Sequence, residues 1–323
     1  MDVSSIIAPV RSELSVFESR FHAAMSSNVG LVDTIVRYVV RRKGKRVRPA
    51  LVLLSAKASG GISDRTYRGA SLVELLHTAT LVHDDVVDDA EKRRGLASIN
   101  AVWKNKVAVL MGDYILARGL LLSLAGEDYD LLRSSSEAVR RMSEGELLQI
   151  QKSRQMNTDE ETYTRIIGDK TASLLAACCE IGARSATDDV SVITRMRDYG
   201  ENIGMAFQIR DDLLDYLGKE SALGKPIGGD LKEKKLTLPL IHALRQASRS
   251  DGRRVLRLLR NGVGRREIAE IVAFVDRNGG TTYARERANQ YRDAAIACLA
   301  DFPDGEAVAS LRQFAQYVVS RSK

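Results

Sequence analysis

The residues best suited to chemistry in this sequence are four aspartates gathered in residues 77–95, HTATLVHDDVVDDAEKRRG. An apolar-patterned helix precedes them, and residues four apart on a helix share a face, so Asp84 and Asp88 point the same way with Asp85 beside them. Like charges at that spacing destabilise a helix by a few tenths of a kcal/mol per pair. Oxygen ligands on a rigid element suit Mg²⁺, which also binds substrate phosphates. The stretch predicts a magnesium site, although one such motif alone fits a solvated acidic helix end equally well.

The same spacing recurs much later in the chain. The stretch QIRDDLLD places Asp211, Asp212 and Asp215 after another apolar run. Two acidic helix segments far apart in sequence can face each other across a cavity, where each brings Mg²⁺ to one side of a single diphosphate. The second copy therefore favours a metal site over a solvated acidic patch on the surface.

Basic residues accompany both acidic segments at positions suited to anion binding. They are Lys45 and Arg48 at a helix junction, Arg93 and Arg94 after the first motif, Lys170 with Thr171 at an expected helix break, and Lys225 and Lys235 in the glycine- and lysine-rich stretch after the second motif. Taken singly, each is more easily interpreted as a solvated surface charge. Together with the carboxylates they predict a site that binds diphosphate twice, once through metal and once directly through cations and helix N–H groups.

The composition favours helices packed on helices in one large domain. The chain has 323 residues, 44% hydrophobic and 28% charged, with only 5% aromatic residues and five prolines. No linker rich in proline, glycine or serine interrupts it, so a single domain over residues 1–323 is expected. Apolar residues recur at helical spacing throughout, and no alternating segments are bounded by hairpin turns. The fold class predicted is all-α with almost no sheet.

Charge and cysteine usage exclude several other classes of protein. The formal charge is +7 and the isoelectric point about 9.3, but the basic clusters contain no interleaved aromatics for stacking bases. Three cysteines without CxxC spacing predict neither a disulfide framework nor a zinc site. The N-terminus lacks a secretory pattern, and the apolar run at residues 49–56 is far short of a membrane span. We therefore expect a cytoplasmic protein with no membrane span and no nucleic-acid partner.

At these motifs the chain resembles the trans-prenyl diphosphate synthases, the helical homologues of farnesyl and geranylgeranyl diphosphate synthase. DDVVDD with the following RRG resembles the family's first aspartate-rich motif, FQIRDDLLDY the second, and DLKEKKLTLPL the segment after it. GKRVRP resembles the motif that binds the homoallylic substrate, except that Lys43 stands where the family usually has glycine. The resemblance is strong over residues 43–239. It implies a single-domain bundle of the isoprenoid synthase type around a deep central cavity.

The resemblance also assigns roles position by position. It implies that Asp84, Asp85 and Asp88 hold two Mg²⁺ against an allylic diphosphate, and that Asp211 holds a third with support from Asp212 and Asp215. Contacts to the same diphosphate are implied for Arg93, Lys170, Lys225 and Lys235, with Gln208 and Thr171 placing it. Isopentenyl diphosphate is implied to bind Lys45, Arg48, His77 and Arg94. His77 on its own would be interpreted as a structural helix histidine whose ring nitrogens are hydrogen-bonded within the fold.

The implied reaction is electrophilic. The C–O bond of the allylic diphosphate ionises, the double bond of isopentenyl diphosphate attacks the cation, and a proton is lost. No side-chain nucleophile is needed, and none of the usual triads is recognisable. Water must be kept from the cation, and residues 218–235 form a candidate lid.

Product length is predicted from the two residues one turn before the first motif, Ala79 and Thr80. Both are small, whereas in the family a bulky aromatic here gives short products. We expect the chain to grow towards the helix at residues 106–122, with Met111, Leu116 or Leu120 as candidate floors. The expected product is octaprenyl-type, within hexaprenyl to nonaprenyl, for a quinone side chain.

Three alternatives stay open. They are a shorter-chain geranylgeranyl or farnesyl diphosphate synthase, the non-catalytic subunit of a heteromeric prenyl synthase, and a terpene cyclase. A cyclase usually carries an Asn/Ser/Glu pattern as its second metal motif and does not need GKRVRP. A non-catalytic subunit would be expected to have lost aspartates. The resemblance implies a homodimer.

Overall fold

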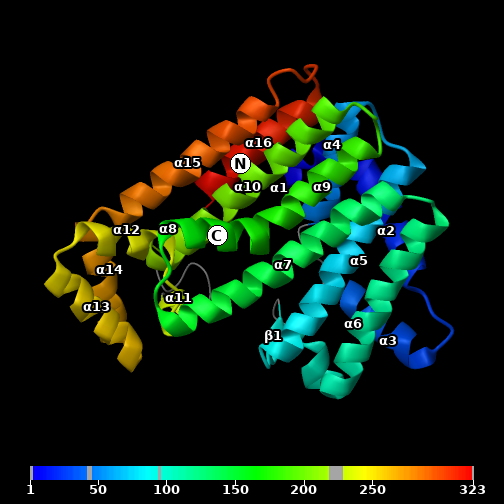
Figure 1. Ribbon diagram of the computed structural model, residues 1–323. Helices are drawn as coiled ribbons and strands as arrows, with labels where there is room; N and C mark the ends of the chain where they lie inside the picture. The colour runs from blue at the N-terminus through cyan, green and yellow to red at the C-terminus, as the bar shows by residue number, and fades with distance from the viewer. Residues whose placement is uncertain (1–2, 42–45, 94–95, 218–227, 322–323) are drawn as a thin grey trace. The chain divides into compact units, whose positions relative to one another are not determined.

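The computed structural model describes residues 3–41, 46–93, 96–217 and 228–321, without the side chain of Arg93. Within these residues the regular elements are helices apart from one short antiparallel pair, β1 (Lys92–Arg93) with β2 (Leu96–Ala97) (Figure 1). The all-α prediction is confirmed. The chain forms two compact units by its internal contacts.

The first unit comprises Met1–Val139, Ala177–Arg197 and Asp301–Leu311. Its described elements are α1 (Val3–Ile6), η1 (Ala8–Val10), α2 (Arg11–Met25), α3 (Gly30–Val40), α4 (Val47–Ser59), α5 (Asp64–Val87), the β1–β2 pair and α6 (Ile99–Ala125). It also contains the start of α7 (Tyr129–Gln155), most of α9 (Ser173–Arg184) and the starts of α10 (Val190–Leu217) and α16 (Glu306–Ser320).

Close packing around α4 and α5 gives the first unit its core. In α4 every residue from Pro49 to Ala56 is buried, which matches its unbroken apolar sequence. Gly182 of α9 approaches α4 so closely that an added Cβ would lie 2.3 Å from the carbonyl oxygen of Val52. The sequence favours Ser63 as an N-cap after the glycines at residues 60–61, and Ser63 does start α5, in a capping box with Thr66. These contacts fix the helix that carries the first aspartates.

The long helix α6 packs against α5 on one side and is apolar on the other. Its backbone leaves helical geometry at Lys104, and the continuous part then runs to Ala125, close to the predicted start at residue 106. Among the described helices, α6 is the one with the length and hydropathy of a membrane span, but a third of its most apolar stretch is buried in the protein. Core helices of soluble proteins meet the same criteria, so this finding alone does not indicate a span.

The second unit comprises Arg140–Ala176, Asp198–Ala300 and Arg312–Lys323. Its described elements are the rest of α7, α8 (Glu160–Ile167), the π-helix η2 (Gly168–Ala172), the start of α9, the rest of α10, α11 (Gly229–Lys232), α12 (Leu238–Gln246), α13 (Arg249–Asn261), α14 (Arg265–Arg277), α15 (Gly280–Cys298) and the end of α16.

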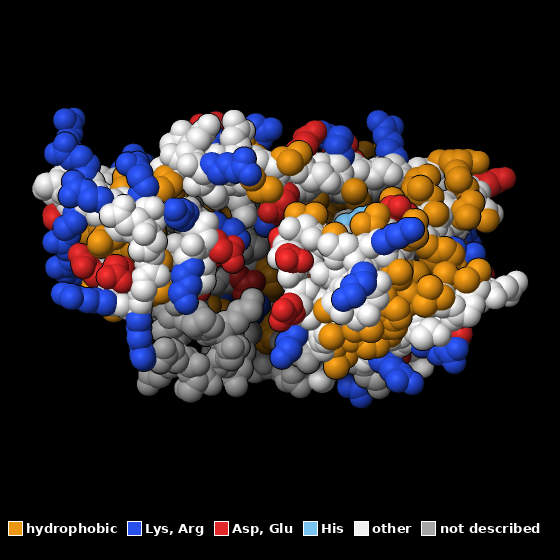
Figure 2. All heavy atoms as spheres, turned by 90° about the horizontal axis from the view of Figure 1, so that it is seen from below, with side chains coloured by type: hydrophobic (Ala, Val, Ile, Leu, Met, Phe, Trp, Pro, Cys, Tyr) orange, Lys and Arg blue, Asp and Glu red, His pale blue; other side chains and the backbone are white. Residues whose placement is uncertain are grey.

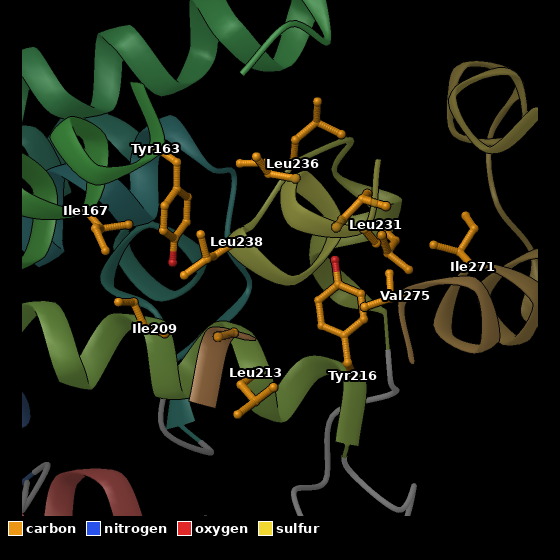
Figure 3. Packing of buried hydrophobic residues seen from close by; sticks show 14 of the residues in the cluster. Tyr163, Ile167, Ile209, Leu213, Tyr216, Leu231, Leu236, Leu238, Ile271 and Val275 are labelled. Atoms are coloured by element: carbon orange, nitrogen blue, oxygen red, sulfur yellow. The ribbon is translucent and has the colours of Figure 1, made fainter. Parts of the chain in front are cut away.

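A hydrophobic cluster joins these helices around the second half of α10. Ile209, Leu213 and Tyr216 of α10 pack with Tyr163 of α8 and Leu231 of α11, together with side chains of α12, α14 and α15 (Figure 3). Because Ile209, Leu213 and Tyr216 follow helical spacing, they occupy one face of α10 and leave the aspartates of the second motif on adjoining faces. The cluster thereby sets the orientation of that motif.

Candidate active site

The first aspartate motif occupies the C-terminal end of α5. Asp84 and Asp85 lie in the last turn, and Asp88 is the C-cap, where the chain turns through Asp89 at a φ of +49°. Asp84 and Asp88 are exposed. A helix C-terminus carries partial negative charge, so carboxylates there are unfavourable unless a cation compensates them. The placement therefore fits a cation site at this end.

Asp85 points differently from its two neighbours. Only 2% of it is exposed, and its main-chain oxygen accepts a hydrogen bond from Asn100 Nδ2 at 3.1 Å. It lines a pocket of the first unit together with His77, one of the predicted substrate contacts. The three predicted metal ligands on α5 are therefore split between an exposed pair and a buried member.

The same pocket contains Arg46, which belongs to the GKRVRP segment but is not among the predicted site residues. Arg46 is the N-cap of α4 and has a φ of +51°, a left-handed conformation that is uncommon for a residue with a side chain. Its guanidinium lies 3.2 Å from Glu18 Oε1 and 3.7 Å from Glu74 Oε1. These two ion pairs hold Arg46, which directly follows Lys45, a predicted substrate contact, in the sequence. Arg48 is half-buried in the first turn of α4.

Five residues predicted from separate motifs line one pocket of the second unit. They are Lys170, Thr171, Gln208, Asp212 and Lys235, and the pocket is completed by residues that include Gln149, Tyr163 and Asp230. Because they come from η2, from α10 and from the segment after α11, only folding brings them together. Their gathering in one hollow is the strongest structural support for the predicted site.

Asp212 is the buried carboxylate of that pocket. It is 5% exposed and accepts hydrogen bonds from Tyr163 Oη at 2.7 Å and from Gln208 Nε2 at 2.8 Å. Gln208 in turn accepts one from Thr171 Oγ1 at 2.8 Å. Burial raises the pKa of Asp212 to about 7, and the nearby carboxylate of Asp230 adds to the shift. Tyr163 was not identified from sequence, because nothing marks it beyond ordinary helical patterning.

Asp215 and Asp230 form a second acidic contact. Both carboxylate oxygens of Asp215 accept main-chain N–H groups at the start of α11, Gly229 N and Asp230 N, each at 3.1 Å. Asp215 thus positions Asp230, whose pKa is raised to about 6 by burial first and by Asp215 next. The sequence offered a signal for Asp230, since it opens the DLKEKK segment that follows the second motif.

Lys170 and Lys235 supply positive charge to this pocket. Lys170 Nζ donates to Gln149 Oε1 at 3.3 Å and pairs with Glu146. Burial lowers the pKa of Lys235, but its pairing with Glu233 and the charge of Asp230 outweigh that effect and raise the pKa overall. Lys235 therefore stays cationic at neutral pH, as an anion site requires.

The expected helix break at Lys170 is a π-helix, and close packing supports it. Arg141 donates to Asp169 Oδ1 at 2.8 Å and to both oxygens of Glu201 at 2.7 and 3.1 Å. An added Cβ on Gly145 would lie 2.8 Å from the main-chain nitrogen of Lys170. Such one-turn π segments are frequent at functional sites. The pattern TDEE at residues 158–161 predicts Thr158 as the cap of the next helix. The cap of α8 is instead Asp159, which accepts from Thr162 N, so the prediction is wrong by one residue because aspartate is the stronger acceptor there.

Asp211 differs again, because it pairs with the C-terminal segment. Arg321, just after α16, pairs with Asp211 Oδ1 and lies over the ring of Phe207 at 3.9 Å. Arg210 donates to the main-chain oxygen of Arg321 at 2.8 Å. Arg321 was missed because nothing in the sequence links the last residues to the second motif.

The predicted chain-length residues lie on α5 at the level of the middle of α6. Gly112 would meet His83 if it carried a Cβ, and Gly119 would meet Leu75, so the helices run antiparallel with this register. Ala79, 2% exposed, therefore lies opposite Ile115, and Thr80 is half-buried on the adjoining face. Of the proposed floors, Met111 is buried, Leu116 is half-buried and Leu120 is exposed.

Some predicted residues fall outside the described part of the chain. They are Lys45, Arg94 and Lys225, together with the side chain of Arg93 and most of the candidate lid. Among the described residues, no three His, Cys, Asp or Glu side chains form a ready metal cage. Mg²⁺ is usually held by one or two carboxylates plus substrate phosphates, so donors of this kind suit a metal that arrives with its substrate.

Comparison with known proteins gives one consistent family. Residues 29–275 match the sequence profile described as polyprenyl synthetase. The chain is 37% identical to the all-trans-nonaprenyl-diphosphate synthase (geranyl-diphosphate specific) of Rhodobacter capsulatus, over 93% of this chain and 92% of that protein. It is 36% identical to the octaprenyl diphosphate synthase of Escherichia coli (strain K12), over 93% of each chain. The crystal structure of a polyprenyl synthase from Caulobacter crescentus CB15, complexed with calcium and isoprenyl diphosphate, superposes with a TM-score of 0.90 at 33% identity, covering 100% of this chain and 98% of that one.

Proposed function

Because the chain belongs to the polyprenyl synthetase family and is a prenyltransferase of isoprenoid biosynthesis, we propose that it makes a long all-trans polyprenyl diphosphate. It adds isopentenyl diphosphate to an allylic diphosphate such as farnesyl diphosphate, with octaprenyl diphosphate as the central expectation and a quinone side chain as the destination. The observation that carries the proposal is the pocket where Lys170, Thr171, Gln208, Asp212 and Lys235 meet.

In this proposal residues 1–323 act as a single catalytic domain, and both aspartate motifs bind the allylic diphosphate through Mg²⁺. The residues fit such a metal: Asp84 and Asp88 lie where helix charge favours a cation, and the acidic pair of Asp212 and Asp230 needs positive charge to ionise fully. Magnesium would be held by Asp84, Asp85, Asp88 and Asp211, supported by Asp212 and Asp215. The calcium in the Caulobacter relative's structure supports a divalent ion. When bound, the metal supplies charge stabilisation to departing pyrophosphate.

The protein's own groups then have distinct tasks. Lys170 and Lys235 neutralise charge that develops on the leaving diphosphate, and their carboxylate partners hold them in place. The hydrogen-bonded series Thr171, Gln208, Asp212 fixes the orientation of the polar wall. The apolar cluster behind it keeps water from the cation. Isopentenyl diphosphate binds at Arg48 and His77, with Lys45 and Arg94 as further contacts.

Long products are proposed because α5 carries no bulky plug near the reacting end. Ala79 and Thr80 leave room where an aromatic would block chain growth. Ala79 and Thr80 lie in different surroundings. By the register of α5 against α6, Ala79 packs on α6, whereas Thr80 faces a less crowded side and donates a hydrogen bond to His77 O at 2.9 Å. Thr80 is therefore the better position for a plug. The octaprenyl and nonaprenyl relatives support a long product.

We further propose a cytoplasmic homodimer that joins two copies through α6. Val109, Leu110, Leu121 and Leu124 are exposed and lie within one face of the continuous part of that helix. Figure 2 shows hydrophobic side chains gathered on the right of the face it presents. Contiguous apolar surface of this kind marks interaction sites in soluble proteins. Sedimentation of the purified chain tests the dimer.

The decisive experiment is product sizing. The purified chain is incubated with farnesyl diphosphate, labelled isopentenyl diphosphate and Mg²⁺, and the products are separated by length. We expect hexaprenyl to nonaprenyl diphosphate; a stop at geranylgeranyl assigns the shorter-chain class, and no product without a second protein assigns the heteromeric one. Asp84→Asn should lower the rate by at least about a hundredfold. Asp188→Asn, which changes an exposed aspartate outside the site, serves as the matched control.

A further inference from the structure

One short segment of the second unit carries most of the chain's excess positive charge. Residues 249–266, which form α13 and the start of α14, contain seven arginines and one aspartate, a formal charge of +6 in a chain whose total is +7. All seven arginines are exposed: Arg249, Arg253, Arg254, Arg257, Arg260, Arg265 and Arg266. We call this the arginine surface. Figure 2 shows basic side chains gathered at the left end, where Figure 1 places α13.

The arginines of α13 share one face of the helix. Arg253, Arg257 and Arg260 recur at intervals of four and three residues, so they project from the same side. The opposite side buries Val255 and Leu259 in the hydrophobic cluster of this unit. The helix is therefore amphipathic, with its apolar half used for folding and its basic half turned to solvent.

This charge is not explained by the stability of the helix. Like charges four residues apart destabilise a helix, and the acidic residue of the segment, Asp251, is used at the N-terminus of α13, where Ser248 Oγ accepts from its main-chain N–H. Arg254 pairs with Glu270 at 2.7 Å, which offsets the charge of that arginine. A surface that concentrates charge at a cost in stability indicates an anionic partner.

We propose that the arginine surface docks the protein on the anionic face of a phospholipid membrane. This inference rests on the proposed function, because a long polyprenyl diphosphate is an amphiphile whose tail has to pass from the enzyme into a bilayer. A cluster of exposed arginines matches the electrostatic recognition of anionic headgroups, with the apolar half of α13 remaining in the fold of the unit. The described segment has no aromatic side chain on which bases could stack, which disfavours single-stranded nucleic acid as the partner.

The test measures binding to vesicles without substrate or metal. The full chain is sedimented with phosphatidylcholine vesicles that contain or lack phosphatidylglycerol. We expect binding only when the anionic lipid is present, and release when ionic strength rises from about 0.1 M to about 1 M, because the Debye length falls from about 10 Å to about 3 Å. Equal binding to neutral vesicles, or persistence at high salt, overturns the proposal.

A matched pair of variants locates the contact. Arg253→Gln, Arg257→Gln and Arg260→Gln together keep the helix propensity and leave the Arg254–Glu270 pair intact. Each arginine at an anionic surface contributes roughly fivefold to binding, so the triple variant should bind about a hundredfold more weakly. The control changes Arg11, Arg133 and Arg197 to glutamine, which removes the same charge from exposed sites elsewhere and should bind like the unaltered chain.

The outcomes are separable from those of the proposed function. The triple variant should extend farnesyl diphosphate at the unaltered rate in detergent-free solution, since none of its positions lies at the active site. Vesicle binding that survives the triple variant, or that is lost equally in the control, overturns the arginine surface as the contact. Tighter binding to a mixed-sequence RNA than to anionic vesicles overturns the choice of partner. A chain with no prenyl transfer at all defeats the proposed function without altering these binding results.

Discussion

Replacing Asp212 by asparagine should stabilise the metal-free protein, although the residue belongs to the proposed site. The carboxyl group is buried with Asp230 near it, and its pKa is raised from 3.8 to about 7. A raised carboxyl pKa means that the folded state binds the proton more tightly than the unfolded state does. The favourable contribution is therefore present below pH 4 and is lost as pH rises through 7.

The size of the effect follows from the shift. About three pKa units correspond to about 4 kcal/mol, which is the cost of holding the ionised group in the folded protein above pH 7. Asparagine is never ionised, and it can still accept the hydrogen bond from Gln208 and meet the Tyr163 hydroxyl with its amide. Allowing for relaxation around the charge, we expect a gain of about 2–4 kcal/mol at pH 8 and almost none at pH 4.

Thermal unfolding in the presence of a chelator measures this directly. For a chain of this length 1 kcal/mol corresponds to roughly 1–2 °C in Tm, so Asp212→Asn should unfold several degrees higher than the unaltered protein at pH 8. Mg²⁺ with pyrophosphate should reverse the order, because the unaltered protein gains stability from the ligand and the variant gains less. A lower Tm for the variant at pH 8 without metal, or an equal gain at pH 4, would refute the reasoning.

Three further predictions concern the surroundings of the site. Arg141→Met should cost about 2–3 kcal/mol of unfolding free energy, because it leaves the half-buried carboxylates of Asp169 and Glu201 without their shared cation. The control Arg140→Gln changes an exposed neighbour and should cost under about 0.5 kcal/mol. Chemical denaturation of both variants compares the two costs. Arg321→Gln should lower about threefold the Mg²⁺ concentration that half-maximally raises Tm with pyrophosphate, since it removes a cation that competes for Asp211, and an unchanged midpoint would contradict this. Thr80→Phe should shorten the product at unaltered Tm. Ala79→Tyr should shorten it too, but should also lose about 1–3 kcal/mol of unfolding free energy by overpacking against α6. Products as long as those of the unaltered protein would show that the tunnel runs elsewhere.

The sequence predicted the fold class and the helices of both motifs because those features are local. Apolar spacing in α5 and α10 is a pattern of period 3.6, and Ser63 is a cap that any helix start would favour. The helix break at Lys170 was also predictable, although its π geometry was not. Such geometry arises from packing, here the close approach of Gly145 to the main chain of η2.

Burial and partners could not be predicted from the motifs. The aspartates of the first motif look equivalent in sequence, yet Asp85 is buried and Asp84 exposed, because the face turned towards Asn100 depends on where α6 packs. Tyr163 and Arg321 were missed for the same reason. Each meets the second motif across more than 45 residues of chain, and no local pattern records a contact of that range.

Within each unit, the residues proposed for the site show arrangements that are unfavourable for an isolated protein. Carboxylates end α5 where the helix dipole is negative, Arg46 adopts a left-handed backbone, and two carboxyl groups with raised pKa share one pocket. Each of the acidic arrangements is relieved by positive charge that the described side chains supply only in part, since Lys170 and Lys235 are already paired with glutamates. A divalent cation and a diphosphate bound together would relieve them without changing the net charge greatly. These arrangements lower the free energy of unfolding of the ligand-free protein, and binding of the metal and substrate recovers that free energy. A folded chain can keep such unfavourable arrangements because they strengthen the binding that its function needs.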